Sequence, residues 1–68
     1  MTLFELRADY LRRTMHAMEK KAEFDSRLKK DQYEYESQRV SDAVEYSRLS
    51  TQITCYETIT SELERLSL

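Results

Sequence analysis

The chain has 68 residues, so it forms at most one structural unit, and a domain of this size buries too little surface to be comfortably stable alone. One cysteine and one histidine exclude an intrachain disulfide and the usual Cys/His zinc arrangements. Gly and Pro, the strongest turn signals, are both absent, and 35% of the residues are charged. The composition predicts an all-α module over residues 1–68 that is stabilised by a partner.

The two halves of the chain carry opposite net charges. Residues 1–30 hold eight Lys or Arg against five Asp or Glu, a net +3, whereas residues 31–68 hold three against eight, a net −5. This distribution opposes the helix dipole, which favours acids near the N-terminus and bases near the C-terminus. Antiparallel pairing of the two halves explains it, because bases would then face acids.

The most regular element lies in residues 1–24. Thr2 and Glu5 fit a capping box, which predicts a helix that starts at Thr2. Apolar residues then recur at steps of three and four, the spacing of one helix face. We call this set the N-terminal stripe: Met1, Phe4, Ala8, Leu11, Met15, Met18 and Ala22.

A polar middle, residues 25–39, follows the stripe. Opposite charges four residues apart, such as Asp25 and Lys29, support helix there even though the apolar spacing stops. The chain therefore either continues as one long helix or turns back as a hairpin within residues 31–38. The absence of Gly favours the long helix.

Apolar spacing resumes in residues 40–68, less regularly and with many Ser and Thr. Its positions are Tyr46, Leu49, Ile53, Tyr56, Ile59, Leu63 and Leu66, which we call the C-terminal stripe. Residues 52–60 have the propensity of a strand, but the chain offers no second strand and no hairpin turn to pair with it. Helix is therefore the prediction.

Two stripes around a polar middle predict a long amphipathic helix or two-helix hairpin that associates as an antiparallel coiled coil or helical bundle, with residues 1–24 facing residues 44–68. Such a module binds itself or another helical protein, as a structural or scaffold element. The alternative is that the same residues form the core of a self-contained hairpin. The expected interface residues are Phe4, Ala8, Leu11, Met15, Met18, Ala22, Leu49, Ile53, Tyr56 and Leu63.

A second interpretation rests on two copies of Tyr-x-x-Leu/Ile, beginning at Tyr46 and Tyr56 with six residues between them. This spacing resembles tandem phosphotyrosine signalling motifs, in which a phosphate on each Tyr is read by Arg clusters. A helical stripe produces the same steps of three, and phosphorylation of either Tyr would oppose its burial.

Other chemistry is disfavoured. His16, Glu19 and Glu23 share a helix face but lack the order and the further ligands of a helical metal site, so no metal or cofactor is expected. A further alternative is that the chain is part of a membrane-associated helical bundle, with the bases of residues 1–30 against anionic lipids. Acids are interleaved with these bases, which disfavours a membrane contact, and no nucleic acid is expected as a partner. No nucleophile, base and phosphate cradle occur together, so the chain is predicted not to be an enzyme. Acidic residues near the N-terminus and the lack of a long apolar run favour a cytoplasmic location.

Overall fold

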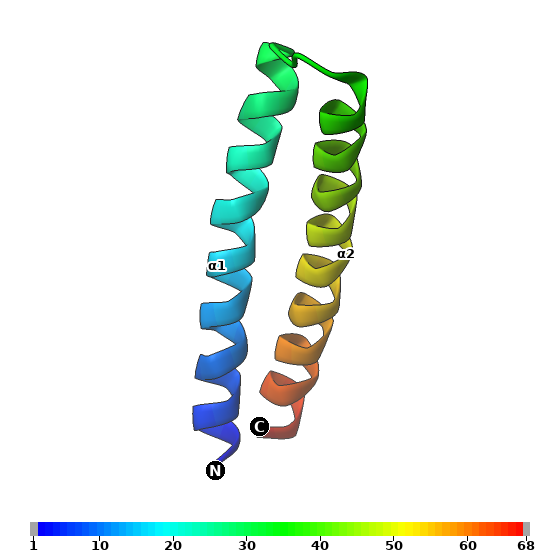
Figure 1. Ribbon diagram of the computed structural model, residues 1–68. Coiled ribbons are helices and arrows are strands. Elements are labelled where there is room, and N and C mark those ends of the chain that lie inside the picture. The colour runs from blue at the N-terminus through cyan, green and yellow to red at the C-terminus, as the bar shows by residue number, and fades with distance from the viewer. Residues whose placement is uncertain (1, 68) are drawn as a thin grey trace.

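The computed structural model describes residues 2–67, which form two helices, α1 (Leu3–Lys30) and α2 (Glu36–Ser67). The helices lie side by side and run in opposite directions, so the start of α1 and the end of α2 lie together, away from the connection (Figure 1). The Cα atoms span 50 × 17 × 14 Å, which is the shape of a thin rod. The all-α prediction is confirmed in its hairpin form.

The start of α1 is set by the predicted cap. Thr2 has extended backbone angles, and its Oγ1 accepts a hydrogen bond from the N–H of Glu5 at 3.1 Å. This bond satisfies one of the N–H groups that the first helical turn leaves unpaired. Glu5 also places an acid in the first turn, where the helix dipole favours it.

The connection is made without glycine. Asp31 ends α1 in the left-handed region, at φ 50° and ψ 42°, and its N–H donates to the carbonyl oxygen of Arg27 at 3.1 Å. Asp is one of the few residues other than Gly that adopt this conformation readily. The expectation of one long helix, which rested on the absence of Gly, is therefore wrong.

The two helices pack around a small apolar core. Ala17 from α1 and Leu49 and Ile53 from α2 are buried together, with Phe24 and Tyr56 packed against them. Farther along α2, Thr60 and Leu63 are also buried. The C-terminal stripe thus supplies most of the buried residues between the helices.

Charged and polar contacts tie the helices together near both ends of the hairpin. Arg7 pairs with Glu64 at 2.9 Å near the chain ends. Near the connection, Asp42 lies 3.8 Å from Arg27 and accepts a hydrogen bond from the hydroxyl of Tyr33 at 2.6 Å. In the pairs Arg7–Glu64 and Arg27–Asp42, a base of the positive half meets an acid of the negative half.

Candidate protein-interaction surface

The N-terminal stripe lies on the outside of the hairpin. Its large side chains are exposed, with exposed fractions of 74% for Phe4, 64% for Met15, 53% for Met18 and 40% for Leu11. Ala22 is exposed and Ala8 half-buried, while Met1 lies outside the described residues. An apolar row about 27 Å long, from Phe4 to Ala22 at 1.5 Å per residue, is therefore left uncovered by α2.

A different face of α1 contacts α2. This face consists of Ala17, which is buried, and of the half-buried residues Leu6, Tyr10, Thr14, Lys21, Phe24 and Leu28. At 100° per residue it lies roughly 130° around the helix from the N-terminal stripe. Helix α1 thus has two apolar faces, and the hairpin uses the less regular one.

This arrangement corrects one part of the predicted geometry. Residues 1–24 do lie beside α2, as the contacts of Arg7 with Glu64 and Tyr10 with Tyr56 show. However, the alternative in which both stripes form the core of one hairpin does not hold for the N-terminal stripe, whose large side chains are exposed. Of the expected interface residues, Leu49, Ile53 and Leu63 are buried and Tyr56 is half-buried between the helices.

The face of α1 that contacts α2, which we call the inner face, was not predicted because polar residues interrupt its apolar spacing. Thr14 lies part-buried there and donates its hydroxyl hydrogen to the carbonyl oxygen of Tyr10 at 2.8 Å. The ammonium of Lys21 lies 5.2 Å from the centre of the Tyr46 ring, a cation–π contact. Long basic side chains can cover apolar surface with their stems while the charge stays near water. The available signal was the recurrence of Leu6, Tyr10, Ala17, Phe24 and Leu28 at steps of four and seven residues.

The two edges of the N-terminal stripe differ in their surroundings. The inner edge, on the side of α2, holds Arg7 and Lys21, which contact Glu64 and Tyr46 respectively. The outer edge holds Glu5, Arg12 and Glu19, all exposed and spaced by seven residues, so their charges alternate along the helix. Among residues 2–67, the carboxylates of Glu5 and Glu19 make no ion pair. The Arg12 guanidinium lies 4.0 Å from the Asp9 carboxylate, a long contact that leaves its side chain 78% exposed.

At one place the stripe joins a depression between the helices. Met18 and Ala22 lie at its rim, and Tyr46 and Ile53 contribute from α2. Lys21, Asp25 and Glu57 complete the lining. The depression extends the uncovered apolar surface from α1 toward α2, and it gives an approaching side chain a place to insert.

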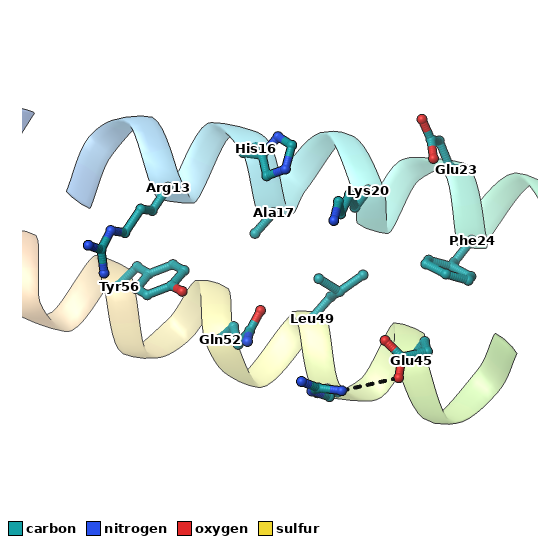
Figure 2. Close-up of a pocket in the computed structure, with 11 residues that line it drawn as sticks. Arg13, His16, Ala17, Lys20, Glu23, Phe24, Glu45, Leu49, Gln52 and Tyr56 are labelled. Carbon is teal, nitrogen blue, oxygen red and sulfur yellow. Dashed lines mark hydrogen bonds and ion pairs between the residues drawn. The ribbon is translucent and has the colours of Figure 1, made fainter. Parts of the chain in front are cut away.

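The other groove between the helices, about 450 Å³ in volume, has a mixed lining of charged, polar and apolar side chains (Figure 2). Figure 2 shows the side chains of Ala17, Leu49 and Tyr56 between the two helices. Arg13 and Lys20 line the α1 side, and the Glu23 carboxylate points away from α2. Arg48 is already paired with Glu45 at 3.3 Å. Among residues 2–67, no group of three or more His, Cys, Asp or Glu could hold a metal ion.

The two tyrosines of the tandem motif face the interior of the hairpin. Both are half-buried: Tyr46 lies under the Lys21 ammonium, and the Tyr56 ring is 5.9 Å from that of Tyr10. Leu49, three residues after Tyr46, is buried in the core. A phosphate on either Tyr would have to leave this interface, so packing accounts for the spacing and opposes phosphorylation in the folded state.

Comparison of the chain with protein-family models, with curated proteins and with solved structures gives no match. Within residues 2–67, neither helix is long and apolar enough to cross a membrane.

Proposed function

We propose that this chain is a non-enzymatic association module, a structural or scaffold element that binds a helical partner through the N-terminal stripe. The observation that carries the proposal is the exposure of that stripe, whose members follow one another at coiled-coil spacing along α1. Single exposed apolar residues are normal on protein surfaces, whereas a continuous apolar row marks an interaction site.

The weakness of the hairpin's own core supports the proposal. No large side chain among the described residues is fully buried, and the buried set is small: Ala17, Leu49, Ile53, Thr60 and Leu63. Fully burying a Leu, Met or Phe side chain contributes about 1.5–3 kcal/mol. A helix laid on the stripe would cover four such side chains that α2 leaves in water, so association would add substantially to the stability of the fold.

Two methionines in the stripe suit this role. Met15 and Met18 have unbranched, polarizable side chains that adapt to irregular partner surfaces. The partner in this proposal is a second copy of the chain or another helical protein. Phosphotyrosine signalling gains no support from the positions of Tyr46 and Tyr56.

The test is sedimentation equilibrium over a concentration series, with helicity followed by circular dichroism on the same samples. We expect Leu11→Asp to abolish association while the chain stays as helical as the dilute wild type, because Leu11 does not pack in the hairpin core. Lys29→Asp, beyond the stripe on the same helix, is the matched control and should associate normally.

A third variant separates folding from association. Leu49→Asp places a charge in the buried core and should abolish helicity itself. If Leu11→Asp and Lys29→Asp associate equally well, the N-terminal stripe is not the binding surface. The reference for helicity is the wild-type chain at a dilution where the wild type is monomeric. If Leu11→Asp loses as much helicity relative to this reference as Leu49→Asp does, the stripe is part of the folding core.

A further inference from the structure

Resting on the proposed function, we infer that the occupant of the N-terminal stripe is a second copy of this chain, with the two α1 helices antiparallel about a two-fold axis near Arg13. Closed two-fold dimers are the commonest protein assemblies, and they require a surface that is complementary to itself. Two independent features of the stripe meet this requirement: the sizes of its side chains and the charges of its outer edge.

The side chains match by size in this register. The axis near Arg13 sets Phe4 opposite Ala22 of the second copy, Ala8 opposite Met18, and Leu11 opposite Met15. A large residue thus meets a small one in four of the six layers, and two residues of similar volume meet in the other two. Alternating large and small side chains lets facing helices interdigitate without voids. All six described positions of the stripe are used.

The charges of the outer edge match in the same register. A two-fold axis across the helices sets each outer edge against the outer edge of the other copy. Side chains on a helix lean toward its N-terminus. On two antiparallel helices, two side chains therefore lean toward each other when each lies on the side of the other's N-terminus. Arg12 then reaches Glu19 of the second copy across an axial offset of about 7.5 Å, and symmetry forms this ion pair twice.

Other arrangements bring like charges together. Sliding one helix by seven residues in either direction sets Arg12 against Arg12 of the second copy or Glu19 against Glu19. Parallel pairing sets the outer edge against the inner edge, so that Arg12 lies beside Arg7 of the second copy. Electrostatic complementarity mainly fixes orientation and register, and here it selects the register in which the apolar layers also match.

The rest of the hairpin leaves room for this pairing. Helix α2 lies roughly 130° around α1 from the stripe, on the side of the inner edge, so it does not obstruct a second α1. The basic residues of the inner edge are occupied within the chain, since Arg7 is paired with Glu64 and Lys21 contacts the Tyr46 ring. The dimer is therefore a row of four helices with the two α1 helices at its centre.

Charge reversal at Arg12 and Glu19 tests the orientation by sedimentation equilibrium. Arg12→Glu alone sets two carboxylates against each other across the interface, and Glu19→Arg alone sets two guanidinium groups together. Each variant should therefore raise the dimer dissociation constant about tenfold. An equimolar mixture of the two variants should associate as tightly as wild type. In the heterodimer, both contacts between position 12 of one chain and position 19 of the other again pair opposite charges. The doubly reversed chain should also associate as tightly as wild type.

Lys20→Glu is the control, because it reverses a charge of α1 away from the stripe and should leave the dissociation constant unchanged. If the mixture associates no better than the single variants, while Leu11→Asp still abolishes association, the orientation is overturned and the proposed function stands. If the wild-type chain stays monomeric at every concentration, the second copy is excluded as the occupant. If Leu11→Asp associates like wild type, the proposed function itself fails.

Discussion

At the scale of single residues, Tyr33 and Asp42 fasten the connection to α2. The Tyr33 hydroxyl donates to Oδ2 of Asp42 at 2.6 Å, while Oδ1 of the same carboxylate lies 3.8 Å from Arg27. Partial burial of the phenol and its hydrogen bond to Asp42 raise the pKa of Tyr33 to about 12. The Asp42 carboxylate therefore contacts both the connection, through Tyr33, and the end of α1, through Arg27.

This pair predicts a pH dependence of stability. Below about pH 10 the phenol is protonated in both the folded and the unfolded chain. Between pH 10 and 12 the unfolded chain loses the Tyr33 proton first, so the folded chain binds more protons and its free energy of unfolding falls as pH rises. Urea unfolding should show Tyr33→Phe to be less stable than wild type at pH 8, with the difference shrinking toward pH 12.

Tyr35→Phe is the matched control for this experiment, because Tyr35 is 61% exposed on the same connection. Over pH 8 to 12 this variant reports the loss of a phenol that makes no hydrogen bond to Asp42. A constant difference for Tyr33→Phe over that range would show that the hydrogen bond to Asp42 does not govern titration of the phenol.

At the scale of elements, the reversal after α1 depends on one left-handed residue. Asp31 at φ 50° accepts a conformation that costs most residues with a side chain roughly 1–2 kcal/mol. Its carboxylate also lies 3.5 Å from Nε of Arg39 across the connection, an exposed pair of small value. The hairpin therefore tolerates the absence of Gly.

The effect of an Asp31 substitution on the free energy of unfolding should depend on backbone conformation rather than on charge. Asp31→Val places a β-branched residue in the left-handed region and should lower the free energy of unfolding by about 1–2 kcal/mol. Asp31→Gly removes the same carboxylate but fits the backbone, so it should be at least as stable as wild type. Thermal unfolding followed by circular dichroism measures both, with Gln32→Val as the neighbouring control. Equal losses for Val and Gly would mean that the Arg39 pair sets the stability.

The sequence predicted the elements better than their faces. The Thr2 cap and the buried Leu49, Ile53 and Leu63 followed from capping chemistry and from apolar spacing. The inner face of α1 did not, because Lys21 interrupts it and periodicity cannot tell which of two apolar faces meets α2. A turn within residues 31–38 was one of the two predicted alternatives, and the absence of Gly weighed wrongly against it because Asp31 adopts the left-handed conformation. Whether the N-terminal stripe is an interface remains a prediction.

At the scale of the whole molecule, the hairpin is a layer of two helices with one apolar face of α1 uncovered. Helical proteins bury their apolar faces by packing helices on one another, and two helices alone leave outward faces uncovered. Here α2 covers the inner face of α1, whereas Phe4, Met15 and Met18 stay in water. The proposed pairing of two hairpins through α1 would cover this face with the chain's own sequence, and it would leave α2 at the periphery with its exposed Val40 and Val44 uncovered.

Disulfide cross-linking measures the orientation of this pairing directly. In a Cys55→Ser background, which removes the only native thiol, one chain carries Ala8→Cys and another Met18→Cys. The antiparallel register sets these two positions opposite each other, so the mixed chains should oxidise to the heterodimer. Two copies of position 8 lie about 15 Å apart along the axis, beyond the reach of a disulfide. Mass spectrometry under non-reducing conditions identifies the products, and an excess of the position 8 homodimer would show that the α1 helices pair in parallel.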